Sequence, residues 1–215
     1  MAASEPETPT IARGYSSSNR TANALLEATI DALDTVGEGG LRISVLLEQA
    51  DSSVSSLYHH FGSREGLVIA ANSERFTRSI ALQIETFAAA MEQVTSSEEL
   101  EAVLAGVIAS LNDPESQIFR QRRISVLGGA LTRPALLEAI SERQHELFAL
   151  TATVIDTAKD RGLVRADLDS LAYASWLFGM ILGRMLAEID PSRPDQSGWD
   201  EIALQALVAP LRLSG

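Results

Sequence analysis

The sequence predicts an all-α protein with a small N-terminal three-helix domain and a larger C-terminal helical domain. Apolar residues recur at three- and four-residue spacing through most of the chain, which is the period of an amphipathic helix. No segment of length alternates with period two, so no β-sheet is expected. The apolar residues are mainly Leu, Ala and Ile, only 5% of the chain is aromatic, and helix-forming Glu, Gln and Arg lie between them. With 215 residues, the chain is long enough to bury a core.

The N-terminal helices are expected to be short and separated by turns. Leu26, Ile30 and Leu33 place one apolar stripe on the first helix, and the glycine-rich stretch 37–40 is expected to end it. Turn and cap residues at 51–53 and 62–63 separate the helices that follow. The predicted helices cover residues 20–36, 43–50, 54–60 and 64–82.

The rest of the chain is expected to hold further helices between residues that end them. Pro and Gly at 112–114, 133–134 and 161–162 interrupt the apolar pattern. The predicted helices cover residues 84–94, 98–111, 115–129, 135–161, 168–189 and 199–213. The chain is therefore expected to consist of a polar, disordered arm (1–18), an N-terminal domain (19–66) and a C-terminal domain (67–215).

The composition argues against several classes of function. Cysteine is absent, which excludes disulfide frameworks, thiolate zinc sites, iron–sulfur clusters and a cysteine nucleophile. The chain has no phosphate-binding glycine loop, no H-E-x-x-H and no G-x-S-x-G, so we expect neither an enzyme nor a cofactor. His59 and His60 diverge by about 100° on a helix, and no third ligand lies nearby, so no metal site is expected.

The distribution of apolar residues indicates a soluble, cytoplasmic protein with no membrane partner. The first residues contain no apolar segment of signal-peptide length. The longest charge-free apolar run, residues 170–183, is too short to cross a bilayer core of about 30 Å and is typical of a buried helix.

The charge argues against a nucleic-acid partner overall but not locally. The formal net charge is −12, from 29 acidic and 17 basic residues, whereas nucleic-acid-binding domains are usually basic. Residues 52–64, however, contain no Asp or Glu. A DNA-binding surface is therefore still compatible with this part of the chain.

The two short helices predicted over 43–50 and 54–60 are joined by a tight turn, and this arrangement is the helix-turn-helix pattern. From the end of that turn, residues 53–67 read SVSSLYHHFGSREGL. This stretch resembles the DNA-binding signature of the TetR family of transcriptional regulators, which typically reads S-x-G-T-L-Y-Y-H-F-x-S-K-E-x-L. The matching residues are Ser53, Leu57, Tyr58, His60, Phe61, Ser63, Glu65 and Leu67. The resemblance covers residues 20–69. It implies an all-helical regulator, most often a repressor, that binds a palindromic double-stranded DNA operator as a homodimer and is released by a small-molecule effector.

The chain departs from the family pattern at several positions. Asp51 stands where the family usually has Gly in the turn, and Leu41 stands where it usually has a Thr cap. Arg42 and Ser44 appear in the opposite order from the common S-x-R arrangement. Three further departures, on the second helix of the motif, are Val54, Ser55 and His59. The operator preference of relatives is therefore not carried over.

The outer face of the predicted helix over 54–60 is the candidate DNA-binding surface. With Leu57 and Phe61 pointing inward, Val54 is free to contact a thymine methyl, and Ser55 or Ser56 to bond a base edge or phosphate. The resemblance assigns Tyr58 to base or phosphate contact, and His60 and Arg64 to phosphate. The candidate DNA-binding residues are Arg42, Ser53, Val54, Ser55, Ser56, Tyr58, His59, His60 and Arg64.

Residues 168–189 are apolar nearly all round, so this helix must be covered on two faces. One face meets its own domain, and the other is placed to meet a second protomer, forming with residues 199–213 the four-helix dimer interface that the resemblance implies. The candidate interface residues are Leu171, Phe178, Gly179, Leu182, Gly183 and Trp199. The alternative is a core helix within one chain.

The resemblance also implies an apolar effector held among the C-terminal helices. The candidate pocket residues are Phe87, Met91, Phe119, Phe148, Trp176 and Met180, with Arg122, Arg123 and His145 as polar handles. The alternatives are ordinary core for the apolar residues and a solvated surface for the arginines.

Two other functions remain open. The first is a helical small-molecule sensor or interaction protein whose DNA-binding half has decayed, which Asp51, Leu41 and the acidic charge favour. The second is an enzyme, for which carboxylates such as Glu142 and Glu146 are better explained as an exposed helix face.

Overall fold

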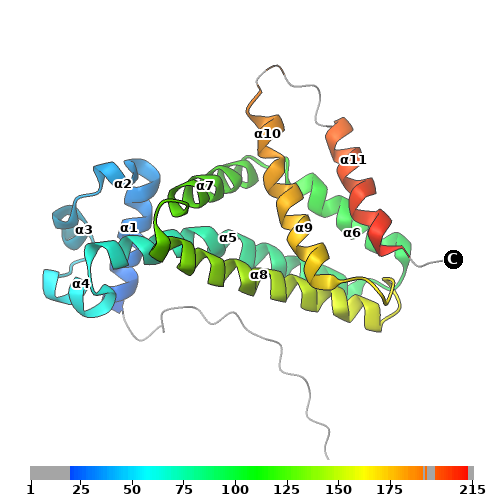
Figure 1. Cartoon of the computed structure of the whole chain (residues 1–215), viewed down its shortest axis with the longest axis horizontal. Coiled ribbons are helices and arrows are strands. Elements are labelled where there is room, and N and C mark those ends of the chain that lie inside the picture. Colours follow the sequence, from blue (N-terminus) through cyan, green and yellow to red (C-terminus); the bar gives the residue numbers. More distant parts are fainter. Residues whose placement is uncertain (1–19, 191, 193–196, 213–215) are drawn as a thin grey trace, which may run out of the picture.

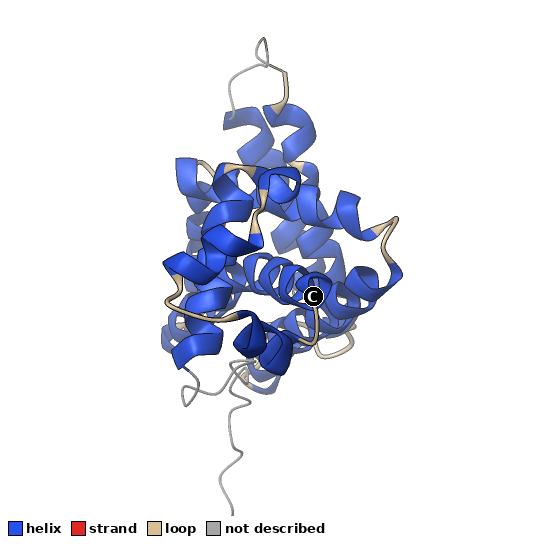
Figure 2. Cartoon of the chain, turned by 90° about the vertical axis from the view of Figure 1, so that its left-hand side faces the viewer, coloured by secondary structure: helices blue, strands red, loops and turns tan. Residues whose placement is uncertain are grey.

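The computed structural model describes residues 20–190, 192 and 197–212, and every regular element among them is a helix (Figures 1 and 2). The helices are α1 (Arg20–Thr35), α2 (Gly37–Gly40), α3 (Ile43–Gln49), α4 (Val54–Phe61), α5 (Arg64–Gln93), α6 (Ser97–Ser110), α7 (Pro114–Ala130), α8 (Pro134–Asp160), α9 (Ser170–Gly183), α10 (Met185–Glu188), α11 (Ser197–Val208) and the 3-10 turn η1 (Ala209–Leu211). The predicted all-α fold class is confirmed. The predicted arm, residues 1–18, lies outside the described residues, as does the last residue of the helix predicted over 199–213.

Helices α1 to α4 and the first turns of α5 form a small bundle at one end of the molecule (Figure 1), which we call the head. One apolar cluster holds the head together, because each helix contributes the residues of its inward stripe. Its buried members are Leu25, Leu26, Ile30, Leu33, Leu41, Leu46, Ala50, Leu57, Leu67, Val68 and Ala71.

The remaining helices form a larger unit, which we call the body. Helices α5 and α8 pack side by side along the long axis, α7 lies against both, α9 packs on α8, and α6 pairs with α11 (Figure 1). The main apolar cluster of the body joins residues of α5, α6, α8, α9 and α11. A smaller cluster lies where α5, α7 and α8 meet, around Phe76, whose side chain is fully buried.

The structure corrects the expected boundary within α5. The sequence predicted two helices, over 64–82 and 84–94, but α5 runs without a break from Arg64 to Gln93. Gln83, at the expected boundary, is a good helix former, and neither Gly nor Pro lies near it. The continuous helix therefore connects the head to the body.

Two other segments also differ from the predicted helices. The helix predicted over 168–189 begins at Ser170, where the Asp169 carboxylate accepts a hydrogen bond from the Ala172 N–H (2.9 Å), and it is interrupted at Arg184 before α10. Arg184 is 1% exposed, and its side chain is held in a polar network described below. The glycine-rich stretch after α1 was expected only to end that helix, but it forms the further helical turn α2.

Candidate nucleic-acid interface and internal cavity

Helices α3 and α4 form a helix-turn-helix whose turn is fixed by local backbone geometry. Ser53 has an extended backbone at the start of α4, and its hydroxyl accepts a hydrogen bond from the Ser56 N–H (3.2 Å). Asp51 in the turn has a φ of +45° and is the one non-glycine residue with positive φ among those described. The chain thus forms the turn with an Asp in the left-handed region, at the position where the family pattern has Gly.

Helix α4 has one face in the head and one face in solvent, as its sequence predicted. Leu57 is 2% exposed and belongs to the apolar cluster of the head. Val54 and Tyr58 are 55% and 59% exposed, and Ser55 and His59 are also exposed. The outer face offers methyl, hydroxyl, phenol and imidazole groups, and no described residue of α4 is acidic. Their contact with DNA stays a prediction.

The two histidines of α4 are neighbours, and they differ in exposure. Ser56 and His60 are half-buried, and the ring centroids of His59 and His60 lie 4.8 Å apart in an edge-to-face arrangement. Among the described residues, no group of three or more His, Asp or Glu side chains is placed to hold a metal ion.

The start of α5 is fixed by a close approach of the backbone. The Ser63 hydroxyl caps this helix by accepting a hydrogen bond from the Gly66 N–H (2.9 Å). A Cβ on Gly66 would lie 2.0 Å from the Phe61 carbonyl oxygen, so only glycine fits there. Arg64 follows the cap directly and is exposed at a helix N-terminus, the end of a helix that attracts anions.

Most acidic side chains of the head are paired with arginines that lie beyond it. Of the seven acidic residues between positions 20 and 65, four make such pairs. The pairs join Asp34 to Arg75 and Arg122, Glu27 to Arg78, and Glu38 and Glu65 to Arg133. The hydrogen bond from Arg78 holds the pKa of Glu27 below its ordinary value. By contrast, Arg42 and Arg64 are exposed, and neither makes an ion pair with a described residue.

The sequence matches no protein-family model and no curated protein. Solved structures, however, match over almost the whole chain. A protein of Mesorhizobium loti assigned to the TetR-family transcriptional regulators is similar with a TM-score of 0.68, over 91% of this chain and 98% of its own, at 22% identity. A second from Rhodococcus sp. has a TM-score of 0.64 over 90% of this chain and 100% of its own, at 22% identity. A third, from Cytophaga hutchinsonii, has a TM-score of 0.65 over 94% of this chain and 100% of its own, at 19% identity.

The chain has the TetR fold. At identities this low the likeness shows the fold, and it agrees with the resemblance found in residues 53–67. In the TetR fold of this chain, the head carries the helix-turn-helix, and α5 connects it to the body.

The body of this TetR fold contains a partly open, mostly apolar cavity of about 920 Å³. Residues of α5, α6, α7 and α9 form most of its wall. Three of the predicted pocket residues, Phe87, Phe119 and Arg123, line it. Its volume is near the upper end of the range of about 300–1,000 Å³ that is usual for small-molecule sites.

The other predicted pocket residues do not line this cavity; they are Met91, Arg122, His145, Phe148, Trp176 and Met180. Met91 and Met180 pack in the main core of the body, and Met91 also borders a separate small cavity. Arg122 pairs with Asp34 of the head and does not face the cavity, because it points about 100° away from its neighbour Arg123, which does. His145 and Trp176 are exposed, and Phe148 packs edge-to-face on Phe178.

Arg123 is a buried charged residue in the cavity wall. It is 6% exposed, and its guanidinium lies 3.8 Å from the centroid of the Phe76 ring. Nη1 donates to the Phe76 carbonyl oxygen (2.8 Å) and Nη2 to Gln144 Oε1 (2.7 Å). Burial lowers the pKa of Arg123 to about 10, because the charged form has lost its hydration.

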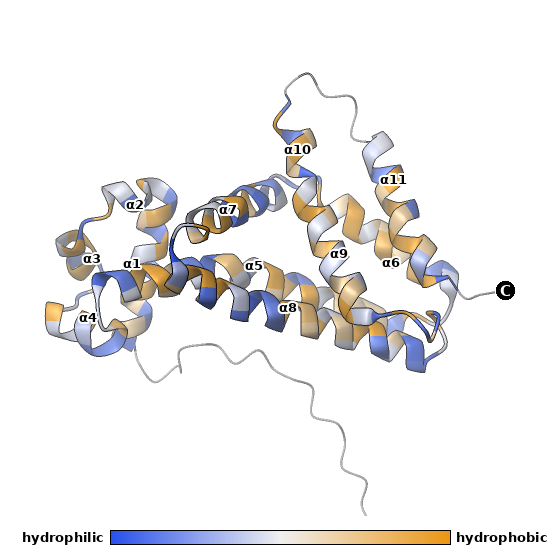
Figure 3. Ribbon diagram, viewed as in Figure 1, coloured by the Kyte–Doolittle hydropathy of each residue, from blue (hydrophilic) through white to orange (hydrophobic). Residues whose placement is uncertain are grey.

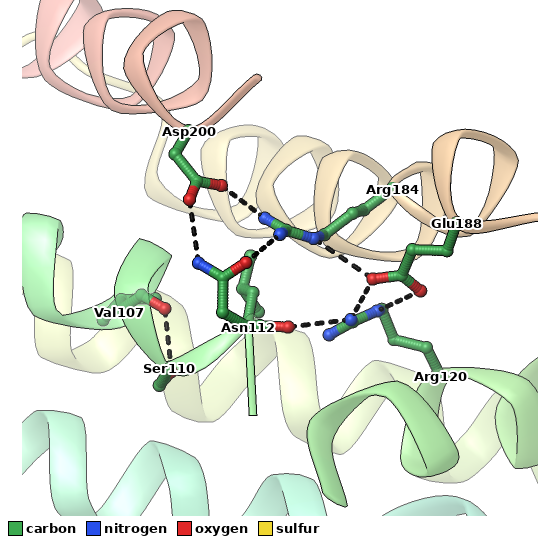
Figure 4. Close-up of polar contacts among 8 residues, drawn as sticks. Val107, Ser110, Asn112, Arg120, Arg184, Glu188 and Asp200 are labelled. Carbon is green, nitrogen blue, oxygen red and sulfur yellow. Dashed lines mark hydrogen bonds and ion pairs between the residues drawn. The ribbon is translucent and has the colours of Figure 1, made fainter. Parts of the chain in front are cut away.

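Sequence reasoning missed a buried polar network in the body (Figure 4). Arg184 donates to Glu188 (3.1 Å), Asp200 (2.6 Å) and the Asn112 side-chain oxygen (2.6 Å), and Arg120 also pairs with Glu188. Two arginines and two carboxylates balance one another and connect α7, α10 and α11. The available signal was the spacing of Arg184 and Glu188, four residues apart in an otherwise apolar segment.

The predicted dimer-interface residues are divided between two faces of the body. Those that lie on the uncovered face of α9 are Leu171, Gly179 and Gly183, which are exposed. Phe178 and Leu182 line the cavity instead, and Trp199 lies over the Arg184 guanidinium at 4.6 Å. Within the described residues, Ser170–Glu188 is the one helical stretch long and apolar enough to span a membrane, with 22% of it buried. It carries two charged members of the buried network, Arg184 and Glu188.

Proposed function

We propose that this protein is a TetR-type transcriptional regulator that binds a palindromic double-stranded DNA operator as a homodimer. It acts in the cytoplasm as a repressor and is released from the operator by a small-molecule effector. The observation that carries the proposal is the outer face of α4, where Val54, Ser55, Tyr58 and His59 are exposed and no carboxylate stands among them. A helix of this size fits a major groove about 12 Å wide and reads base edges there.

The cations around α4 support the same proposal. Arg42 precedes α3 and Arg64 begins α5, so both lie at ends of helices that flank α4 in the chain. The body arginines already pair with four carboxylates of the head, which leaves Arg42 and Arg64 for phosphates. The local charge is therefore better suited to DNA than the net charge of −12 suggests.

The homodimer would form through the exposed face of α9, together with α11. Helix α9 is composed almost entirely of apolar and small residues (Figure 3), and its exposed residues include Leu171, Trp176 and Gly179. A Cβ on Gly179 or Gly183 would meet nothing within 4 Å, so a second helix can approach closely there. Leu186, Ile189 and Ile202 are 79%, 67% and 70% exposed. With the exposed apolar face of α9, these residues offer apolar surface for a protein contact, and a two-fold axis would bury both copies.

Helix α7 is the element suited to connect the effector with the operator. Its inner face lines the cavity with Phe119 and Arg123, while Arg122 pairs with Asp34 of α1. A shift of α7 on ligand binding would therefore move the head. Because dimers read half-sites about 34–36 Å apart, a shift of a few ångströms is enough to lose the operator.

The experiment selects DNA from a random oligonucleotide library with the full-length protein and measures affinity by gel shift at several salt concentrations. Tyr58→Ala should weaken binding to the selected site, while the protein stays dimeric. Arg64→Gln should reduce the salt slope by about two for a dimer, because each protomer loses about one phosphate contact. Arg143→Gln, on the outer surface of α8, is the matched control and should leave both quantities unchanged.

The proposal fails if the protein forms a dimer but enriches no oligonucleotide. That result would favour a second candidate function, a helical effector-binding protein whose head no longer recognises DNA. The positive φ of Asp51 in the helix-turn-helix is the observation that favours this candidate.

A further inference from the structure

We infer that the effector is an amphipathic monocarboxylate, whose carboxylate binds Arg123 and whose apolar body lies along the cavity. This inference rests on the proposed function, since it names the chemical class of the effector that this function requires. The observation that supports it is that Arg123, a buried arginine without a carboxylate partner among the described residues, lies in the wall of an apolar cavity.

The charge of Arg123 is not balanced within the described part of the chain. No carboxylate there pairs with it, and both of its hydrogen-bond acceptors, the Phe76 carbonyl and the Gln144 amide, are neutral. The aromatic rings of Phe76 and Phe178, whose centroids lie 3.8 Å and 5.9 Å from its guanidinium carbon, supply only a partial counter-charge. A buried charge in such surroundings is unfavourable unless an opposite charge joins it.

The neighbouring arginine of the same cavity wall shows the contrast. Arg120 is one helical turn before Arg123 on α7, lines the same cavity and is equally buried, at 4% exposure. Arg120, however, pairs with Glu188, and the buried Arg184 pairs with Glu188 and Asp200. The other buried arginines of the body are therefore neutralised by carboxylates of the chain itself, and Arg123 is left for a carboxylate from outside.

The polar groups around Arg123 that have no hydrogen-bond partner are N–H donors, so a ligand there has to supply acceptors. Its guanidinium uses Nη1 and Nη2 for one hydrogen bond each and has further N–H groups without an acceptor among the described residues. Gln144 Nε2, on the amide that accepts from Arg123, is buried and makes no hydrogen bond. A carboxylate supplies two oxygens that accept from such donors and forms the strongest pairs with a guanidinium.

The rest of the wall defines the remainder of the ligand. It is mostly apolar, with Phe87, Phe119 and Phe178 among its side chains, so the body of the ligand is apolar. The acidic residues of the wall, Asp113 and Glu115, are exposed at the start of α7. Glu115 is eight residues from Arg123, which is about 12 Å along a helix. One unpaired buried cation thus indicates one anionic group, held at the Arg123 end.

The experiment measures binding to the full-length protein by isothermal titration calorimetry with matched probes of different charge. The probes are decanoate, decanol and decylamine, together with naphthoate and naphthol. We expect one of the two carboxylates to bind about tenfold to hundredfold more tightly than its neutral analogue, as a hydrogen-bonded charge pair would provide. Arg123→Gln should remove this preference while binding of the neutral analogue persists, and Arg123→Lys should keep part of it. Arg143→Gln is the matched control and should retain the full preference.

Each outcome decides the inference. Neutral or cationic probes that bind as tightly as the carboxylates would overturn it, as would an absence of binding by all probes or an unchanged preference in Arg123→Gln. If Arg123→Gln does not fold, the comparison of probes on the unmodified protein and on Arg123→Lys decides. Gel shifts with the selected operator are scored separately. Operator binding without carboxylate binding refutes only the ligand class, and carboxylate binding without operator binding refutes only the proposed regulator.

Discussion

Asp34, on α1 of the head, forms ion pairs with two arginines, Arg75 of α5 and Arg122 of α7. Its Oδ1 accepts from Arg75 Nε (2.9 Å) and Nη2 (2.5 Å), and its Oδ2 pairs with Arg122 Nη2 (2.9 Å). The side chains of Asp34 and Arg75 are only 19% and 10% exposed, so their pair is worth about 1.5–3 kcal/mol as a charge-assisted hydrogen bond. The Arg122 side chain is 35% exposed, and solvent screening reduces that pair to less than about 1 kcal/mol.

Asp34→Asn should therefore lower the free energy of unfolding by about 2 kcal/mol, because the amide retains neutral hydrogen bonds but not the charge. For a chain of this length, that corresponds to a fall in Tm of roughly 4–8 °C. The assay is urea unfolding followed by circular dichroism. The matched control is Asp31→Asn, on the same helix, since Asp31 is exposed and makes no ion pair with a described residue. The reasoning is refuted if the two variants unfold at the same urea concentration.

Three further outcomes follow from the head and its contacts. Gly66→Ala should lower the free energy of unfolding by about 2–4 kcal/mol, because the added Cβ would lie 2.0 Å from the Phe61 carbonyl oxygen. The control in the same urea titration is Gly106→Ala, whose Cβ would meet nothing within 4 Å. This variant should raise the free energy of unfolding by about 0.5–1 kcal/mol. Asp51→Gly should raise the unfolding free energy by about 1 kcal/mol, since glycine adopts the φ of +45° without strain; a lower melting temperature would contradict this. The hydrogen bond from Arg78 lowers the pKa of Glu27 in the folded state, so this pair stabilises the protein above the ordinary carboxyl value of 4.5, and its contribution is lost as the pH falls further. Glu27→Gln should accordingly show a shallower loss of stability between about pH 5 and pH 3, measured as Tm against pH, and a parallel curve would exclude this contribution.

The parts of the molecule that could be predicted from the sequence are those that depend on local spacing. The inward direction of the Leu57 side chain and the outward direction of the Tyr58 side chain follow from the helical period alone. The Ser53 and Ser63 hydroxyls, which cap α4 and α5, accept hydrogen bonds from backbone N–H groups three residues away. The same period also placed Gly179 on the uncovered face of α9.

The parts that could not be predicted depend on partners that packing brings together. Arg120, Arg122 and Arg123 lie within four residues of one another and look alike in sequence. One pairs with Glu188, one pairs with Asp34, and one stays without a carboxylate partner in the described chain. Nothing local distinguishes them, because each partner comes from a helix that only the tertiary fold places beside α7.

These arginines also connect the charge of the head with the proposed release from DNA. The acidity of the head is offset in part by Arg122 and Arg133, which come from α7 and from the turn after it. If a ligand on Arg123 shifts α7, Arg122 leaves Asp34 and the head regains a negative charge at the same time as it moves. Displacement and repulsion would then act together against DNA, and the electrostatic part would fade at high salt because these pairs are partly exposed. In Asp34→Asn that repulsion cannot arise, so the effector should reduce operator affinity less than in the unmodified protein, most clearly at low salt.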